Sequence, residues 1–162
     1  MTGSGKIFLL LGSNLGDRAG ILKQARQMIA EKAPIVTESS IYETEPWGLT
    51  DQPAFLNQVV EVTSTDEPEL LLTHLLHIEQ ELGRVRKVRW GARLIDIDIL
   101  YYGDTILEKE ILTLPHPRLK ERRFTLVPLF EIAAEFVDPK LKKSVSQLLE
   151  ECPDKSEVLK YS

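Results

Sequence analysis

The chain has 162 residues, a formal net charge of −5 and 43% hydrophobic residues, which is typical of one globular domain spanning residues 1–162. Its single cysteine, Cys152, excludes an internal disulfide and a multi-cysteine zinc site. The absence of a long apolar run and of a secretory signal predicts a cytoplasmic protein without membrane contact. The acidic pI of about 5.3 argues against general nucleic-acid binding.

Hydrophobic periodicity and turn residues divide the first half of the chain. The turn Gly12–Asp17 is rich in residues that tolerate left-handed backbone, and Asp17 is a suitable N-cap for the helix that follows. Prolines and glycine predict a loop over 43–53, and Gly83 ends the second helix. Residues 1–5 are expected to be disordered. The expected elements are strands at 6–11, 35–42 and 54–63 and helices at 18–32 and 67–82.

A cationic stretch follows the second helix. Residues 84–93 contain five Lys or Arg residues and no acid, although the whole chain is acidic. Such a concentration of charge favours an anion site over a role in solubility.

The next residues alternate as a strand does. Ile95, Ile97 and Ile99 alternate with acidic and leucine residues, so Asp96 and Asp98 share the opposite face, roughly 6.6 Å apart. Two carboxylates at this separation can hold one or two divalent cations such as magnesium. An Asp-x-Asp pair on a strand is often only a solvated face, but acids within a run of Ile and Leu need partners. Guanidinium groups beside metal-binding carboxylates are what transfer from a polyphosphate requires.

The remaining third adds smaller elements. We expect a hairpin between Gly103 and Leu114, an extended segment at 114–118, a helix at 121–134 interrupted at Pro128, and a last helix at 145–152. The order strand, helix, strand, strand, helix, strand predicts an α+β fold. Its core is a ferredoxin-like split βαβ unit, an antiparallel sheet with two helices on one face, followed by the C-terminal hairpin and helices.

Five stretches together resemble the 6-hydroxymethyl-7,8-dihydropterin pyrophosphokinase family of folate biosynthesis. The fourth stretch is close to a family signature. They are Gly12–Asp17, Tyr42–Thr44, Asp51–Asn57, Arg89–Leu100 and Pro115–Phe124. The resemblance implies transfer of pyrophosphate from ATP to the pterin hydroxymethyl oxygen, with release of AMP and attack at the β-phosphorus.

The resemblance also implies residue roles. Asp96 and Asp98 would bind two Mg²⁺ ions. The implied catalytic residues are Arg84, Arg86, Arg89, Arg93, Asp96 and Asp98. The implied ATP-binding residues are Glu79, Arg84, Trp90, Arg93, Ile99, Thr113, His116, Arg118 and Arg122. The implied pterin-binding residues are Thr44, Trp47, Phe55, Asn57 and Phe124.

The pterin residues have a physical logic. A flat heterocycle with many donors and acceptors suits two stacking rings, here Phe55 and Phe124, and an amide such as Asn57 that both donates and accepts. On the residues alone, Phe55 would be a core residue and Asn57 a turn residue. The loops around Trp47 and Trp90 are expected to close over the site and exclude water.

Two other interpretations remain open at this stage. The first is a nucleic-acid-binding module, because split βαβ domains often bind RNA, but this sheet lacks an aromatic stacking signature. We therefore expect small-molecule substrates and no nucleic acid. We also expect a monomer. The second interpretation is an enzyme with altered chemistry, or an inactive relative that only binds pterin or nucleotide. The presence of all the expected metal and phosphate residues argues against inactivity.

Overall fold

The computed structural model describes residues 5–45, 54–83 and 94–161, and within these ranges an antiparallel sheet forms the centre of the protein. The central strand β1 pairs with β4 on one side and with β5 on the other. Strands β2 and β3 both pair with β4, and β8 extends the edge beyond β3. The strands are β1 (Ile7–Ser13), β2 (Ile35–Glu38), β3 (Tyr42–Thr44), β4 (Phe55–Val62), β5 (Asp96–Tyr102) and β8 (Leu159–Lys160). This topology confirms the predicted ferredoxin-like α+β fold.

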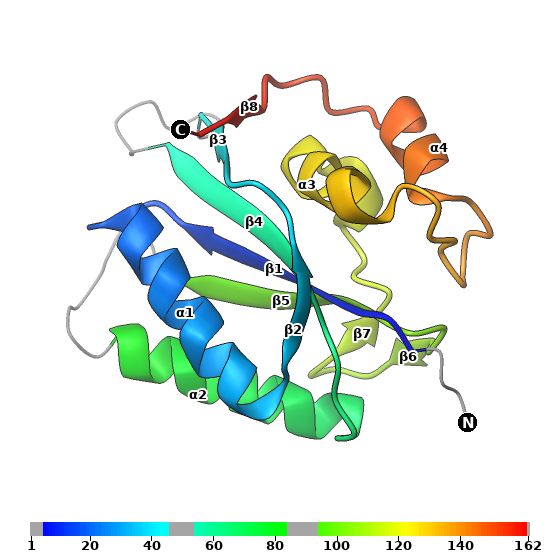
Figure 1. Cartoon of the computed structure of the whole chain (residues 1–162). Helices are drawn as coiled ribbons and strands as arrows, with labels where there is room; N and C mark the ends of the chain where they lie inside the picture. The colour runs from blue at the N-terminus through cyan, green and yellow to red at the C-terminus, as the bar shows by residue number, and fades with distance from the viewer. Residues whose placement is uncertain (1–4, 46–53, 84–93, 162) are drawn as a thin grey trace.

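Helices α1 (Arg18–Lys32) and α2 (Pro68–Gly83) cover one face of the sheet (Figure 1). As predicted, Asp17 caps α1, where its carboxylate accepts a hydrogen bond from the Gly20 N–H at 3.2 Å. The predicted hydrophobic stripes of both helices pack against alternate residues of β1, β4 and β5. This face therefore forms the larger hydrophobic core.

The opposite face is covered by the C-terminal part of the chain, α3 (Arg123–Ala133) and α4 (Val145–Glu151), which lie on the other side of the sheet in Figure 1. The second core contains Phe8, Leu10, Val59, Leu100, Tyr101, Leu126, Leu129, Val145 and Leu148. A register shift between Phe8 and Leu9 in their pairing with β5 places both Leu100 and Tyr101 in this core.

Two strand predictions differ from the structure. The strand predicted at 35–42 is divided into β2 and β3, because at Ser39 the side-chain hydroxyl accepts the hydrogen bond from the Val59 N–H at 3.0 Å, while the Ser39 N–H still donates to the Val59 carbonyl at 2.8 Å. Strand β3 also continues to Thr44, inside the loop predicted at 43–53, because Thr44 pairs with Phe55. Strand β8, at the far end of the chain, was not predicted.

The connection to α3 also differs. The segment predicted as extended at 114–118 contains a cis Leu114–Pro115 bond and a turn that leads into the 3₁₀ helix η1 (Leu119–Glu121). Helix α3 continues through Pro128 without the predicted interruption, and Pro128 is buried within it. Burial of this face of α3 compensates for the missing backbone donor. The predicted hairpin is confirmed as β6 (Leu107–Glu108) paired with β7 (Thr113–Leu114), and the predicted last helix is confirmed as α4.

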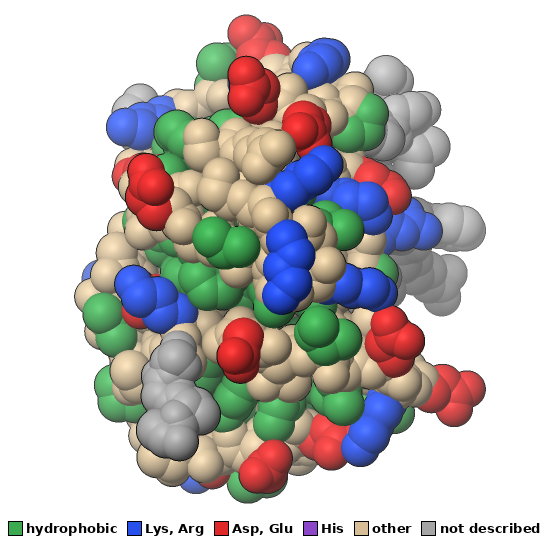
Figure 2. Space-filling view, turned by 90° about the vertical axis from the view of Figure 1, so that its right-hand side faces the viewer, with side chains coloured by type: hydrophobic (Ala, Val, Ile, Leu, Met, Phe, Trp, Pro, Cys, Tyr) green, Lys and Arg blue, Asp and Glu red, His purple; other side chains and the backbone are tan. Residues whose placement is uncertain are grey.

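Several large hydrophobic side chains remain exposed, among them Ile106, Ile111 and Val137. Figure 2 shows that hydrophobic side chains on the face drawn there are interspersed with Lys, Arg, Asp and Glu. Among the helices that the structure describes, none is both long enough and apolar enough to cross a membrane.

Candidate active site

A row of residues across three strands forms the floor of a cavity. Gly12 of β1 lies opposite Asn57 of β4 on one side and opposite Asp96 of β5 on the other. In the next row on the same face, Leu10 lies opposite Asp98. The period of two along each strand therefore brings the two predicted acids beside the predicted amide, on the face that does not carry α1 and α2.

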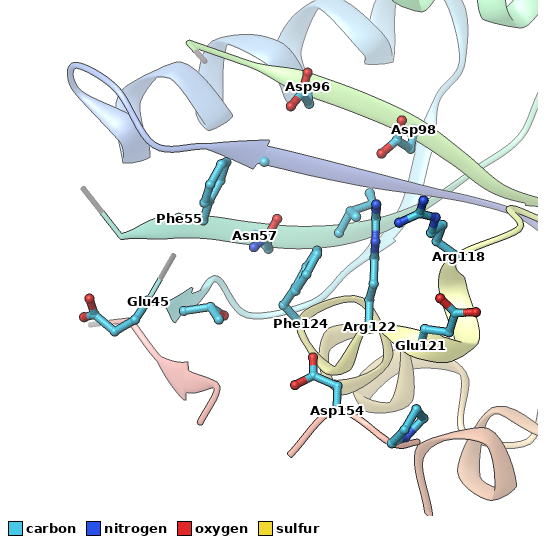
Figure 3. Close-up of a pocket in the computed structure, with 14 residues that line it drawn as sticks. Glu45, Phe55, Asn57, Asp96, Asp98, Arg118, Glu121, Arg122, Phe124 and Asp154 are labelled. Atoms are coloured by element: carbon cyan, nitrogen blue, oxygen red, sulfur yellow. The ribbon is translucent and has the colours of Figure 1, made fainter. Parts of the chain in front are cut away.

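The other wall comes from η1, α3 and the chain beyond α4. The cavity measures about 750 Å³, and it is lined by Leu10, Gly12, Thr44, Glu45, Phe55, Asn57, Asp96, Asp98, Arg118, Glu121, Arg122, Phe124, Pro153 and Asp154. In Figure 3, Arg118 and Arg122 point toward the strand that carries Asp98, and Phe124 lies across the cavity from Phe55. The cavity thus combines a carboxylate pair, a cationic wall and two aromatic rings.

A side chain at position 12 would displace the Asn57 amide from its place. A Cβ atom there would lie 2.7 Å from Asn57 Oδ1, which is closer than such atoms approach. The absence of a side chain therefore lets the Asn57 amide occupy the floor beside Asp96.

The β3–β4 hairpin carries three of the predicted pterin residues. Thr44 pairs with Phe55, and Asn57, two residues further along β4, lies on the same face as Phe55. Asn57 is a buried strand residue and not a turn residue. The Thr44 hydroxyl is buried and has no hydrogen-bond partner among the described residues. Three of the residues predicted to bind the pterin therefore lie on one pair of strands.

His116 lies beside the cationic wall. Burial, and then the positive charges of Arg122 and Arg118, lower the pKa of His116 to about 4. Its Nδ1 atom accepts a hydrogen bond from the Arg118 N–H at 3.1 Å, so the neutral ring carries its proton on Nε2. At neutral pH, His116 is therefore an uncharged donor.

Four described residues that were predicted to bind ATP do not line the cavity, namely His116 and also Glu79, Ile99 and Thr113. The Glu79 carboxylate on α2 accepts a hydrogen bond from the Ile97 N–H at 2.6 Å and so supports the edge strand that carries both acids. The Ile99 side chain is in the core under α1 and α2, and Thr113 lies in β7. Their roles toward ATP stay predictions.

Other predicted site residues fall outside the described ranges: Trp47, Arg84, Arg86, Arg89, Trp90 and Arg93. The cavity also contains residues that the sequence analysis did not assign, namely Leu10, Gly12, Glu45, Glu121, Pro153 and Asp154. Alternation along the first strand could have found Leu10 and Gly12. Nothing in the local sequence indicates that Pro153 and Asp154 reach this cavity, because their place depends on how α4 packs.

The donor set at the sheet edge fits a hard divalent cation. Asp96 and Asp98 both line the cavity and offer only oxygen ligands. In the part of the chain that the structure describes, no group of three or more His, Cys, Asp or Glu side chains could hold a metal by itself. Two carboxylates therefore suit an ion such as Mg²⁺ that takes its other ligands from water and substrate phosphates.

Comparison with known proteins agrees with the fold and the site. A sequence model of the 7,8-dihydro-6-hydroxymethylpterin-pyrophosphokinase (HPPK) family matches residues 8–134. The 2-amino-4-hydroxy-6-hydroxymethyldihydropteridine pyrophosphokinase of Bacillus subtilis is 48% identical over 130 residues, which cover 79% of this chain and 78% of that protein. The protein of the same name from Methylorubrum extorquens is 47% identical over 134 residues, which cover 82% of this chain and 85% of that protein.

Longer relatives also match. The folic acid synthesis protein fol1 of Pneumocystis carinii is 40% identical over 149 residues, 91% of this chain but 20% of that protein. A crystal structure of an HPPK-DHPS protein in complex with substrates superimposes with a TM-score of 0.72 at 16% identity, over 90% of this chain and 42% of that one, which shows a shared fold.

These matches, with the fold and the cavity, define an ATP-dependent transferase. The chain belongs to the 7,8-dihydro-6-hydroxymethylpterin-pyrophosphokinase family, and the enzyme is a pyrophosphokinase.

Proposed function

We propose that the enzyme transfers the pyrophosphoryl group of ATP to the hydroxymethyl oxygen of 6-hydroxymethyl-7,8-dihydropterin, a step of folate biosynthesis. The new bond joins that oxygen to the β-phosphorus. The bond from the β-phosphorus to the oxygen that bridges it to the α-phosphorus breaks, AMP leaves, and the hydroxyl proton is lost. The observation that carries the proposal is that the carboxylate pair, the cationic wall and the aromatic pair line one cavity.

The aromatic end of the cavity suits the pterin. Phe55 and Phe124 come from opposite walls, so a flat ring can stack between them, and the Asn57 amide on the floor offers a donor and an acceptor to the ring edge. The backbone groups of Thr44 would form hydrogen bonds with the remaining polar edge of the pterin ring. A pterin held in this way keeps its hydroxymethyl group at a fixed place, which lowers the entropic part of the activation barrier.

The polar end of the cavity suits the triphosphate. Arg118 and Arg122 point toward the strand of the carboxylate pair, and guanidinium groups bind phosphate oxygens with good geometry. His116, neutral and protonated on Nε2, adds a donor without adding charge. Arg84, Arg86, Arg89 and Arg93, outside the described residues, complete the proposed set of cations that stabilise charge on the transferring group.

Asp96 and Asp98 are the proposed ligands of two Mg²⁺ ions. When bound, Mg²⁺ neutralises phosphate charge and makes a nearby hydroxyl easier to deprotonate. The two carboxylates would fix the positions of the metal ions, because both belong to β5. This strand pairs with β1 on one side and is supported by Glu79, whose carboxylate accepts a hydrogen bond from the Ile97 N–H.

The decisive experiment measures AMP release with and without 6-hydroxymethyl-7,8-dihydropterin, together with the pyrophosphorylated pterin. We expect equal amounts of both products, and no AMP when the pterin is omitted. ADP in place of AMP, or AMP formed at the same rate without pterin, would contradict the proposal. Retention of RNA on a filter without pterin-dependent AMP release would instead support the nucleic-acid-binding alternative.

A further inference from the structure

The cavity wall that carries Arg122 and Phe124 is held by a residue from the C-terminal end of the chain. Helix α3 begins at Arg123, and its N-cap residue, Arg122, makes no capping hydrogen bond through its side chain. The Asp154 carboxylate takes this place, because its Oδ2 atom accepts a hydrogen bond from the Arg123 N–H at 3.0 Å. A carboxylate at this position satisfies one of the free N–H groups of the first turn and interacts favourably with the helix dipole.

Asp154 is itself held firmly. It is 8% exposed, and its Oδ1 atom accepts hydrogen bonds from the Ser156 N–H at 2.9 Å and from the Ser156 hydroxyl. Burial raises the pKa of the Asp154 carboxyl, but the hydrogen bonds from Ser156 and Arg123 outweigh burial and lower it below its usual value. The group is therefore an anion at neutral pH, and its negative charge faces the N-terminal end of α3.

The residues after Asp154 attach to the other wall. Strand β8 pairs with β3 through Tyr42 and Glu43, and the Tyr161 N–H donates to the Ile41 carbonyl at 2.8 Å. Strand β3 is the neighbour of β4, which carries Phe55 and Asn57. Residues 153–161, which we call the C-terminal strap, thus join the first turn of α3 to the edge of the sheet on the pterin side (Figure 1).

We propose that Asp154 and the C-terminal strap are positioning elements for the pterin pocket. They fix the place of Phe124 on α3 relative to Phe55 on the sheet, and so the spacing of the two stacking rings. This inference rests on the function proposed above. Asp154 acts through Phe124, and its own oxygens are occupied by Arg123 and Ser156.

The chain provides a matched control in Asp138. Asp138 is 2% exposed, and its carboxylate accepts hydrogen bonds from the Lys140 and Leu141 N–H groups at 2.8 Å and from the Tyr101 hydroxyl. It therefore resembles Asp154 in burial and in kind of partner, but it does not line the cavity. Loss of stability is expected from Asp138→Asn and Asp154→Asn alike, whereas only the second should change pterin binding.

The experiment measures the Kd of the pterin and the Kd of ATP by calorimetry for the wild type, Asp154→Asn and Asp138→Asn, at a temperature where melting curves show all three folded. We expect Asp154→Asn to raise the pterin Kd about three- to tenfold, the effect of weakening one aromatic stack, and to raise the ATP Kd less. Asp138→Asn should leave both constants unchanged. Ser156→Ala, which removes one donor to Asp154, should also raise the pterin Kd, but by a smaller factor. This variant replaces Asp154→Asn as the test if Asp154→Asn does not fold.

The inference is overturned if Asp154→Asn and Ser156→Ala bind the pterin as the wild type does, or if Asp138→Asn weakens pterin binding as much as Asp154→Asn. Failure of the wild type to release AMP in the presence of the pterin would instead count against the proposed function itself. The two failures are therefore distinguishable.

Discussion

The two faces of the sheet use the same three strands in different ways. Under α1 and α2, the residues of β1, β4 and β5 are hydrophobic apart from two buried polar residues, Ser13 at the end of β1 and Gln58. The Gln58 side chain is hydrogen-bonded to Arg26 and Ser39. On the opposite face the strands pack hydrophobic residues against α3 and α4, and at the cavity end they carry Gly12, Asn57, Asp96 and Asp98 together with Phe55.

This difference separates stability from chemistry. Hydrophobic residues that a helix covers contribute to folding, whereas polar residues left facing a cavity are costly unless a ligand or a partner meets them. We therefore expect substitutions on the first face to lower stability with little effect on activity, and substitutions of the strand residues in the cavity floor to lower activity with little effect on stability.

The largest effect is expected at the carboxylate pair. Asp96→Asn or Asp98→Asn keeps the size of the side chain and removes its charge, so metal-assisted stabilisation worth several kcal/mol is lost and turnover should fall by about two orders of magnitude or more. Circular dichroism should show the fold retained. Asp104→Asn, in an exposed turn, is the control. Near-normal turnover of both cavity variants across a magnesium titration would show that the pair is only structural.

The next effect tests the covered face. Leu75 of α2 is 1% exposed, and Leu75→Ala should lower the free energy of unfolding by about 2–5 kcal/mol. Turnover of the folded enzyme at low temperature should stay unchanged. Leu76→Ala, at a site that is 49% exposed, should change stability by less than about 0.5 kcal/mol. Denaturant titration measures both, and a large loss of activity in folded Leu75→Ala would contradict the separation of the two faces.

A smaller effect is expected at the stacking rings. Phe55→Ala and Phe124→Ala should each raise the pterin Kd by at least about two- to twelvefold, because one stack of about 0.5–1.5 kcal/mol is lost in addition to buried area. ATP binding should change little. Phe130→Ala, on an exposed part of α3, is the matched control. Unchanged pterin affinity in both cavity variants would remove the pocket assignment.

His116, beside the cationic wall, should make the stability of the folded protein depend on pH. Because its folded pKa of about 4 lies below the unfolded value of about 6.5, the unfolded chain binds more protons between these values, and stability falls as the pH falls through this window. His116→Gln should remove part of this fall. Melting temperatures at pH 7 and pH 5 measure it, and an identical pH dependence in the variant would show that His116 is not responsible.

The smallest effect is expected at Thr44. Its hydroxyl and that of Thr125 are buried without a partner among the described residues, so Thr44→Val and Thr125→Val should leave stability unchanged or raise it by up to about 1 kcal/mol. Pterin affinity should not change in either variant, because the backbone of Thr44 is the proposed contact. A marked loss of affinity in Thr44→Val alone would show that the hydroxyl binds the substrate.

Sequence patterns gave the main elements of the sheet correctly because each depends on local rules. Alternation placed Asp96 and Asp98 on one face, and the stripe of Leu71, Leu75 and Ile78 placed α2 against the sheet. The local rules failed at Ser39 and Pro128, where contacts with distant residues override the preference of the chain.

By itself, then, the sequence determined the strands, the two helices of the larger core, the membership of a family and the residue types of the site, since these follow from periodicity and motif. Only the tertiary structure decided that a cavity lies between Gly12 and Asn57 on the sheet and Phe124 of α3, that β8 joins the sheet, and that Asp154 reaches the first turn of a helix that begins at Arg123. These features depend on contacts between residues far apart in the chain, whose closeness is set by the packing of whole elements and leaves no local pattern.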